Sequence, residues 1–211
     1  MNFLNFPVNF VTIEEELKNV LPLLKGRVLN AGCGNRDISD FLKTYYAEEV
    51  ENCDIQSSIP GAIICDLTAI PKEGKYYDAI LCNAVLEHVK DARAVMEEFK
   101  RLLRDDGHLI ISVPFLQPYH PTPTDFRRFT YEGLHRLAAH AGFSITRIIA
   151  LHSLAQTLGW IIWAALEERE SFLGKALFKI PIYLATLFFK TAPNNVKYTA
   201  NSFQAVMVKI D

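Results

Sequence analysis

Short apolar segments alternate with segments of helical periodicity as far as about residue 150, and this alternation constrains the fold most. Six of the apolar segments have the length and composition of buried strands: residues 27–30, 50–54, 62–65, 77–82, 108–113 and 143–150. Helices are predicted for residues 38–45, from Asp91 to just before Gly107, and for residues 131–141 behind Thr130. Strands separated by helices form a parallel sheet with both faces covered. The sequence therefore predicts an α/β protein with three layers.

The last apolar segment, residues 203–210, has a different pattern. Phe203 and Ala205 flank the polar Gln204, as in a strand whose two faces differ. We expect an antiparallel or edge strand that closes the sheet. Residues 151–200, which precede it, break the strand–helix alternation and are predicted to form an apolar helical insertion.

Composition restricts the classes of protein that this chain can be. Its 211 residues, half of them hydrophobic, suffice for one domain over residues 1–211. The net charge is −2 and the pI about 6.3, so we expect no nucleic-acid partner. The four cysteines form no CxxC pair and the N-terminus lacks the features of a secretory signal. Reduced thiols and a cytoplasmic location are therefore expected.

The segment VLNAGCGNRD, residues 28–37, places two glycines directly after the first predicted strand. Glycines there let the backbone turn sharply and approach a ligand at the carboxyl edge of a parallel sheet. A dinucleotide site would have a third glycine three residues after Gly34, where this chain has Asp37, and no GxxxxGK[ST] loop is present. The segment favours a ligand with a compact zwitterionic end and an adenosine.

Two carboxylates follow the next predicted strands. Asp54 ends the second strand, where a carboxylate accepts hydrogen bonds from ribose hydroxyls. Asp66 and Leu67 follow the third strand, where an acid and an apolar side chain can bind the amino group and the ring of adenine. Both features agree with an adenosyl ligand.

The order VLNAGCGN, CDIQ, CDLTAIP, YYDAILCNAVLEHV and LLRDDGHLIISVPF resembles the class I S-adenosylmethionine-dependent methyltransferases of the type 11 methyltransferase-domain kind. The resemblance covers residues 25–150, the cofactor-binding core, and the last strand at 203–210. It implies a Rossmann-like, seven-stranded, mostly parallel sheet with an antiparallel last strand, and S-adenosylmethionine as cofactor. It also implies cofactor contacts for seven residues: Asn30, Gly32 and Gly34 at the methionine end, Asp54 at the ribose, Asp66 and Leu67 at the adenine, and Asn83 near the transferred methyl.

Two residues depart from the family pattern. The family commonly has Asp or Glu where Asn30 stands and a third glycine where Arg36 stands. Asn30 can accept a hydrogen bond but lacks the charge that pairs with the cofactor ammonium, so weaker cofactor binding is expected. The alternative function is a non-catalytic S-adenosylmethionine-binding or scaffold protein of the same fold.

Two segments after the fourth and fifth strands carry the candidate catalytic residues. The first contains Glu87 and His88, and His88 acts either in catalysis or as a turn cap. The second, PFLQPYHPTPTDFRRFT, is stiffened by prolines and resembles a loop that shapes the acceptor site in some of these enzymes. Candidate roles there are catalysis for His120 and Asp125 and acceptor binding for Tyr119 and Arg128. Alternatively, Asp125 and Arg128 form a salt bridge that holds the loop.

No metal site is expected, because His120 and Asp125 lack a third ligand at a suitable spacing.

Residues 151–190 are apolar on several sides, with a polar break at 167–175. They form a lid over the acceptor pocket, a homodimer interface, or a peripheral membrane contact. The resemblance to the methyltransferases implies methyl transfer. We expect a small-molecule or lipid-linked acceptor, with oxygen as the acceptor atom.

Overall fold

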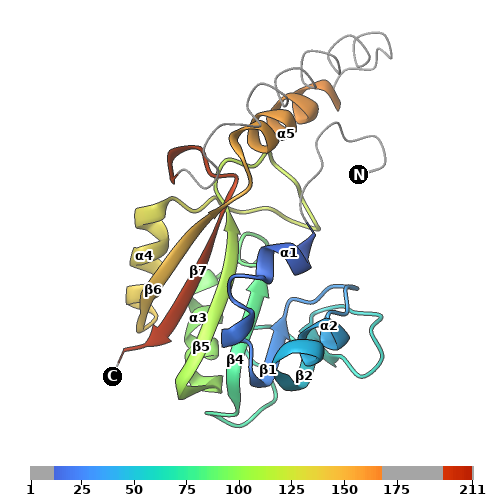
Figure 1. Ribbon diagram of the computed structural model, residues 1–211, viewed down its shortest axis with the longest axis vertical. Helices are drawn as coiled ribbons and strands as arrows, with labels where there is room; N and C mark the ends of the chain where they lie inside the picture. The colour runs from blue at the N-terminus through green and yellow to red at the C-terminus, as the bar shows by residue number, and fades with distance from the viewer. Residues whose placement is uncertain (1–11, 168–196, 211) are drawn as a thin grey trace.

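Seven strands and five α-helices are arranged in three layers in the computed structural model, which describes residues 12–167 and 197–210 (Figure 1). The strands are β1 (Gly26–Ala31), β2 (Ala47–Asp54), β3 (Ile63–Ile64), β4 (Tyr77–Asn83), β5 (Leu103–Pro114), β6 (Phe143–Leu151) and β7 (Ser202–Lys209). The α-helices are α1 (Ile13–Leu17), α2 (Ser39–Tyr45), α3 (Ala92–Leu102), α4 (Tyr131–His140) and α5 (Leu154–Glu167), with short 3₁₀ turns η2 (Leu21–Leu23) and η3 (Lys197–Thr199).

The seven strands form one sheet in the order β3-β2-β1-β4-β5-β7-β6. β7 pairs antiparallel with both β5 and β6, whereas the other neighbouring pairs are parallel. The predicted seven-stranded sheet with an antiparallel last strand is therefore confirmed. The strand order reverses at β1 and β4, and ligands of open α/β sheets bind beside such a reversal.

Two apolar clusters cover the two faces of the sheet. On one face Met96 and Phe99 of α3 and Leu134 of α4 pack on the strands, and all three are fully buried. On the other face Leu17 of α1 and Leu42 of α2 pack on the strands, with the η2 turn between them. Successive residues of β1 enter opposite clusters, as a strand buried on both sides requires.

The predicted helix starts are confirmed. The Asp91 carboxylate accepts hydrogen bonds from the N–H groups of Arg93 and Ala94, both at 3.0 Å, and so caps α3. The Thr130 hydroxyl accepts from the Gly133 N–H at 3.0 Å and caps α4. Each cap satisfies N–H groups that the first turn of a helix leaves without partners.

The end of α3 differs from the prediction. The helix ends at Leu102, and β5 begins at Leu103 rather than at His108. The register of β4 and β5 shifts between Tyr77 and Ala79, which adds the extra residues to the β5 side. A Cβ atom on Gly107 would lie 2.9 Å from the Asp78 carbonyl oxygen, so this glycine allows the two strands to approach rather than ending a helix.

α5 follows β6 and lies beyond the carboxyl ends of the parallel strands (Figure 1). In the stretches that the structure describes, no helix combines the length and the apolar character needed to cross a bilayer. Residues 168–190, which contain most of the predicted polar break and the second apolar segment of the insertion, lie outside the described residues.

Candidate active site

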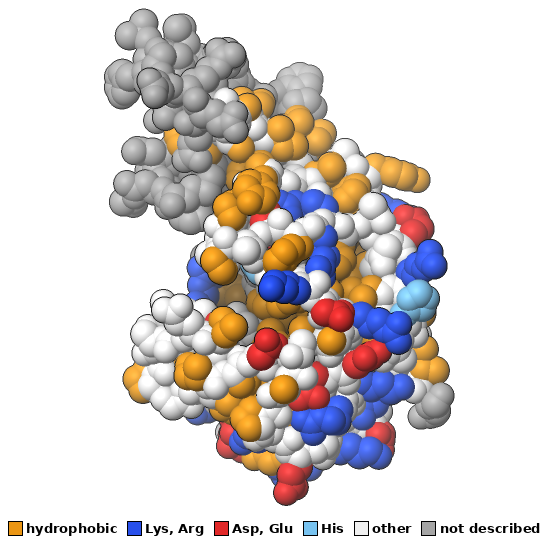
Figure 2. Space-filling view, turned by 180° about the vertical axis from the view of Figure 1, so that it is seen from behind, with side chains coloured by type: hydrophobic (Ala, Val, Ile, Leu, Met, Phe, Trp, Pro, Cys, Tyr) orange, Lys and Arg blue, Asp and Glu red, His pale blue; other side chains and the backbone are white. Residues whose placement is uncertain are grey.

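The connections after the five parallel strands β1 to β5 all begin at the carboxyl edge of the sheet (Figure 1). The face shown in Figure 2 is hollowed near its centre, and hydrophobic side chains line much of this hollow. A separate open depression, lined by Lys75, Lys100, Arg101 and Lys209 among others, lies near the amino ends of the parallel strands. All the predicted site residues lie at the carboxyl ends of β1, β2 and β4 or in the connections that follow β1 to β5, so this other depression contains none of them.

The glycine loop after β1 turns tightly against its neighbours. Gly32 has φ +74°, and a Cβ atom there would collide with the side chain of Val85. The N–H groups of Gly32 and Cys33 donate to the Cys53 carbonyl, at 2.7 and 3.1 Å. Gly34 has φ +55°, but a Cβ atom there would meet nothing within 4 Å. The backbone at Gly34 thus borders open space, as close approach of a ligand requires.

Asp54, at the end of β2, is bound to this loop. Its carboxylate accepts from the Gly34 N–H at 2.8 Å and from the Gln56 N–H at 3.0 Å. Ser57 donates its hydroxyl to the Gly34 carbonyl at 2.5 Å, and the Asn35 side chain accepts from Ser58. The glycine loop and the turn after β2 are therefore one hydrogen-bonded unit.

Asn30 is buried and directed toward β2. Its Nδ2 donates to Oδ1 of Asn52 at 2.8 Å, and Asn52 in turn donates to Ser39 Oγ at 3.1 Å and Asp37 Oδ1 at 3.2 Å. Hydrogen bonds from Ser39 hold the pKa of Asp37 below its usual value. Asn30 thus belongs to a polar network that connects β1, β2 and the start of α2.

The remaining predicted cofactor residues lie in different environments. Asp66 is exposed, and its Oδ1 accepts from the N–H and the hydroxyl of Thr68, both at 2.8 Å; these bonds lower its pKa. Leu67 is buried against the core. Asn83 ends β4, and its Oδ1 is buried without a hydrogen-bond partner in the described part of the chain. A buried oxygen of this kind is suited to accept a hydrogen bond from a ligand.

Four hydrogen bonds connect the loop after β5 to the segment after β4, one of them between Nδ1 of His88 and the Thr124 carbonyl. The Phe126 N–H donates to the Glu87 carbonyl at 2.8 Å, the Thr124 hydroxyl to the His88 carbonyl at 3.3 Å, and the Arg127 guanidinium to the Lys90 carbonyl at 2.6 Å. These bonds bring together two segments that the sequence presents as separate candidates.

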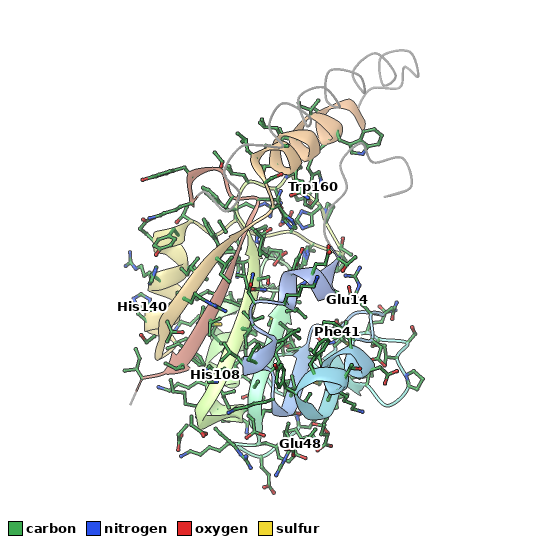
Figure 3. The ribbon with its side chains drawn as sticks, in the orientation of Figure 1. Glu14, Phe41, Glu48, His108, His140 and Trp160 are labelled. Atoms are coloured by element: carbon green, nitrogen blue, oxygen red, sulfur yellow. The ribbon has the colours of Figure 1, made fainter. Side chains whose placement is uncertain are left out.

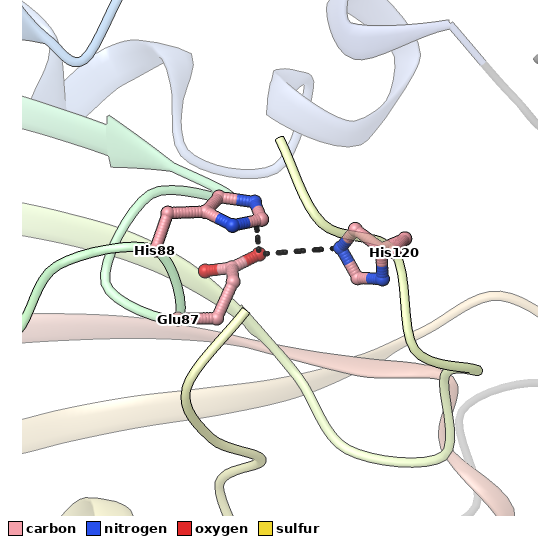
Figure 4. A group of neighbouring side chains, drawn as sticks. All are labelled: Glu87, His88 and His120. Atoms are coloured by element: carbon pink, nitrogen blue, oxygen red, sulfur yellow. Dashed lines mark ion pairs between the residues drawn. The ribbon is translucent and has the colours of Figure 1, made fainter. Parts of the chain in front are cut away.

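Glu87, His88 and His120 form a cluster where the two segments meet (Figure 4). Glu87 is fully buried, and neither of its carboxylate oxygens has a hydrogen-bond partner among the described residues. Its Oε1 lies 3.8 Å from Nε2 of His88 and 3.9 Å from Nε2 of His120. The neighbouring carboxylate of Glu87 raises the pKa of His120. The sequence singled out both histidines but assigned Glu87 no role.

Asp125 and Arg128 form an ion pair, which is the predicted alternative to catalysis and acceptor binding by these two residues. Two guanidinium nitrogens of Arg128 contact the two Asp125 oxygens at 2.5 and 2.6 Å, and the pKa of Asp125 falls to about 2 chiefly through these bonds. Asp125 also accepts from the His120 N–H at 2.8 Å, and Arg128 donates to the carbonyls of Gln117 and Pro118. The pair therefore holds the loop in shape on both sides of His120.

Tyr119, next to His120 in this loop, is 73% exposed. The centroid of the Trp160 ring of α5 lies 5.7 Å from that of the His120 ring. Trp160 lies on the side of α5 that faces the sheet (Figure 3). His108 and His140, which are not among the candidate site residues, lie far from this edge (Figure 3). α5 thus partly covers the cluster.

Comparisons with known proteins agree with this geometry. A family model described as a methyltransferase domain matches residues 10–165. A search of curated proteins gives no significant match.

Solved structures of similar fold include the Burkholderia thailandensis 1,6-didemethyltoxoflavin-N1-methyltransferase, with bound 1,6-didemethyltoxoflavin and S-adenosylhomocysteine (TM-score 0.61, 16% identity, 94% of this chain and 76% of that chain). A SAM-dependent methyltransferase from Archaeoglobus fulgidus (0.61, 14%, 93% and 93%) and the cyclase SpnF (0.61, 16%, 93% and 81%) are also similar. At such identities the likeness concerns the fold, whereas the family match covers more than half of the sequence. The chain therefore belongs to the methyltransferase-domain family, and its fold is that of class I S-adenosylmethionine-dependent methyltransferases.

Proposed function

We propose that this enzyme methylates a hydroxyl oxygen of a small-molecule or lipid-linked acceptor. The observation that carries the proposal is the cluster of the buried Glu87 with the half-buried His88 and His120, at the edge of the sheet where the cofactor loop lies. An oxygen nucleophile must lose its proton as it attacks, and histidine is the usual group that accepts it. A site built for a nucleophile without a proton to lose would not need such a cluster.

The residues at the carboxyl edge fit S-adenosylmethionine. Open space at Gly34 supports close approach of the methionine part, and the buried, unpartnered oxygen of Asn83 supports a contact near the methyl group. Asp54 accepts hydrogen bonds from the loop and has capacity left for ribose hydroxyls. Asp66 and Leu67 follow β3 and provide an acid and an apolar surface for the adenine.

The proposed reaction is an in-line displacement that the chain supports by positioning and proton transfer. S-adenosylmethionine supplies the methyl carbon, and the electron pair of the breaking carbon–sulfur bond stays on sulfur. The chain holds the acceptor hydroxyl beside the cluster, where Nε2 of His120 takes its proton. The buried carboxylate of Glu87 stabilises the imidazolium that results, and His88 lies at the same carboxylate.

Asp125, Arg128 and Tyr119 have different parts in this proposal. The carboxylate of Asp125 is occupied by Arg128 and by the His120 N–H, which favours a positioning role over direct catalysis. Arg128 donates to the loop itself, which likewise favours positioning over acceptor binding. Tyr119 is exposed on the same loop and is the better candidate for a contact with the acceptor.

The class of acceptor is proposed from size and polarity. The Burkholderia relative in fold has a small molecule bound, which supports a small acceptor here. The apolar α5 beside His120 supports an acceptor with a hydrophobic part. Flotation with anionic vesicles tests peripheral membrane contact through residues 151–190, and size-exclusion chromatography with light scattering tests a dimer through the same residues. Protein that stays out of the vesicle fraction contradicts the membrane contact.

A methyl-transfer assay with paired acceptors tests the proposal. Hydroxyl compounds and their O-methyl or deoxy counterparts are offered together with S-adenosylmethionine, and release of S-adenosylhomocysteine is measured with mass spectrometry of the product. We expect turnover only with a free hydroxyl, and loss of kcat in His120→Asn with cofactor affinity retained. Turnover of amines alone, or a His120→Asn variant with full kcat, would contradict O-methylation.

The buried network at Asn30 favours a second candidate, a protein that binds the cofactor without transferring its methyl group. Asn30 carries no charge for the cofactor ammonium, and its Nδ2 is occupied by Asn52. The fold also occurs in a cyclase, so methyl transfer is not its only activity. Tight binding of S-adenosylhomocysteine without turnover of any acceptor would support this candidate.

A further inference from the structure

Three metal-ligating atoms converge where the loops after β4 and β5 meet (Figure 4). One ligand atom from each of Glu87, His88 and His120 lies within 4.8 Å of the other two, and Nε2 of both histidines lies within 3.9 Å of Oε1 of Glu87. We propose that these residues bind one divalent transition-metal ion, with Zn²⁺ as the representative case. The site is distinct from the cofactor residues of the glycine loop.

Hydrogen bonds on the far side of each ring determine which nitrogen faces the cluster. Nδ1 of His88 lies 2.5 Å from the Thr124 carbonyl, and Nδ1 of His120 lies 2.9 Å from the Pro118 carbonyl. A carbonyl can only accept, so each Nδ1 carries the proton and each neutral ring has a lone pair on Nε2. Histidines that bind metals typically donate their other N–H in this way.

Arg128 does not alter this assignment. Its Nη2 lies 3.3 Å from Nδ1 of His120, but it has shorter bonds of 2.6 Å to the Pro118 carbonyl and to Asp125. The ring nitrogen is therefore free to donate to Pro118, and Nε2 is free to bind an ion.

The separations fit a shared ion better than direct contact. Nitrogen and oxygen atoms 3.8 and 3.9 Å apart are beyond hydrogen-bond range. Two bonds of about 2.0 to 2.2 Å from a common Zn²⁺ span such a gap after a small closure of the ligands. The three groups are thus placed around a centre rather than against one another.

The charge balance also favours a cation. Glu87 is fully buried and neither of its oxygens has a hydrogen-bond partner in the described part of the chain. The nearby Asp125 and Arg128 form an ion pair and neutralise each other. A buried carboxylate is costly without a counter-charge, and a divalent ion would supply it.

The donor set selects the kind of ion. Two imidazoles and one carboxylate suit Zn²⁺ and Fe²⁺, whereas Mg²⁺ and Ca²⁺ prefer sites built from oxygen ligands. Three protein ligands leave coordination positions for a hydroxyl or water, as in catalytic rather than structural zinc sites. If the proposed O-methylation is correct, on which this step rests, a bound ion would lower the pKa of the acceptor hydroxyl in place of His120. The hydroxyl proton would then leave to water, because Nε2 of His120 would be a ligand of the ion.

Metal binding is measured first, without any assay of activity. The full-length protein is treated with a chelator, desalted, and titrated with Zn²⁺ against a competing chromophoric chelator, with Mg²⁺ as the comparison ion. We expect one Zn²⁺ per chain. His88→Ala and His120→Ala should each weaken binding by more than the about 10- to 100-fold typical of losing an outer-shell partner. His140→Ala, which removes an exposed histidine at the end of α4, should bind as the wild type does.

X-ray absorption of the zinc-loaded wild type keeps the test independent of variant folding. Two nitrogen and at least one oxygen neighbour at about 2.0 to 2.2 Å support the site. If the wild type binds Zn²⁺ no more tightly than the two histidine variants do, the proposed metal site is wrong. The charge of Glu87 is then balanced by a proton that it shares with a histidine. Zinc binding without methylation of any hydroxyl supports the site and contradicts the proposed function. Methylation that needs His120 but persists without metal supports the proposed function and contradicts the metal site.

Discussion

Arg128 holds both carboxylate oxygens of Asp125, three residues earlier in the same loop, and Asp125 in turn accepts the backbone N–H of His120. The ion pair therefore holds the backbone at His120, the residue whose ring lies next to Glu87. The Asp125 side chain is only 1% exposed, so water cannot take the place of Arg128 at this carboxylate. The position of a proposed catalytic group thus depends on a pair that need not touch the acceptor.

Asp125→Asn should lower both stability and turnover. Removing one charge of a largely buried pair leaves Arg128 unbalanced, and we expect a loss of about 2–4 kcal/mol in the free energy of unfolding. Urea denaturation measures this loss. Glu97→Gln, which breaks the exposed Arg93–Glu97 pair of α3, is the control and should cost less than about 1 kcal/mol. Equal losses in the two variants would contradict the role given to the buried pair.

Gly32→Ala and Gly34→Ala should separate folding from cofactor binding. Both glycines have positive φ, but only at Gly32 does the added methyl collide with the protein, at Val85. We expect Gly32→Ala to be the less stable variant, by about 1–3 kcal/mol relative to Gly34→Ala. Gly34→Ala should keep most of its stability and lose affinity for S-adenosylhomocysteine. Calorimetric titration and thermal unfolding measure the two effects; unchanged affinity in Gly34→Ala would argue against a cofactor at this loop.

Asn30→Asp should bind the cofactor at least as tightly as the wild type and fold less stably. The new carboxylate can pair with the cofactor ammonium, but it loses the donor that Asn52 accepts and adds a second negative charge to the network that contains Asp37. A stability loss of about 1 kcal/mol is expected from the lost hydrogen bond. Isothermal titration with S-adenosylhomocysteine decides the first part. If the variant fails to bind while still folded, Asn30 does not lie at the methionine end.

Glu16 of α1 should make stability depend on pH. Burial raises its pKa to about 7, against the opposing effect of Arg36, and the carboxyl lies 3.3 Å from Nε2 of His152. Because this folded-state pKa exceeds the usual 4.5, the stabilisation is complete below pH 4.5 and is lost as the pH rises through about 7.

Glu16→Gln keeps the shape and removes the titration. Relative to this variant, the wild type should lose up to about 3 kcal/mol between pH 4.5 and 7. His152, whose pKa burial lowers to about 4, contributes the opposite trend in both proteins. Denaturant melts from pH 4 to pH 8 measure the difference. Parallel stability profiles for the two proteins would mean that Glu16 is charged throughout.

Trp160→Ala should affect the acceptor and not the cofactor. Its ring lies beside His120, so its loss should raise the KM of the acceptor by about 3- to 10-fold, the equivalent of an aromatic contact. The dissociation constant of S-adenosylhomocysteine should stay within about twofold. Ile161→Ala, at a more exposed position of the same helix, is the control. An unchanged KM would contradict the lid hypothesis for α5.

The strands and helix caps could be predicted because their signals are local. Asp91 and Thr130 precede amphipathic segments, and each caps the helix as expected. The start of β5 was missed because Leu103 to Gly107, LRDDG, has no strand periodicity. Its extended conformation depends on an irregular pairing with β4. Long-range pairing of this kind leaves little trace in a short window of sequence.

The candidate site was predictable in part for a similar reason. His88 and His120 stand out as histidines near the ends of strands, but their meeting at Glu87 depends on hydrogen bonds between two loops. All of α3 and β5 lie between Glu87 and His120 along the chain, so no short sequence spacing relates these residues. Asn30 gives a further example, because its partner Asn52 lies on the neighbouring strand. The types of residue are visible in the sequence, but their partners are not.

The antiparallel β7 has a consequence for how this protein could diversify. Leu151 and Ser202 are neighbours in the sheet, so the chain leaves β6 and re-enters β7 at nearly the same point, beside the loops that hold His88 and His120. This pairing sets no length for the chain between them. An engineered version with a different segment between these two residues would therefore keep the same sheet, and with it the cofactor half of the enzyme.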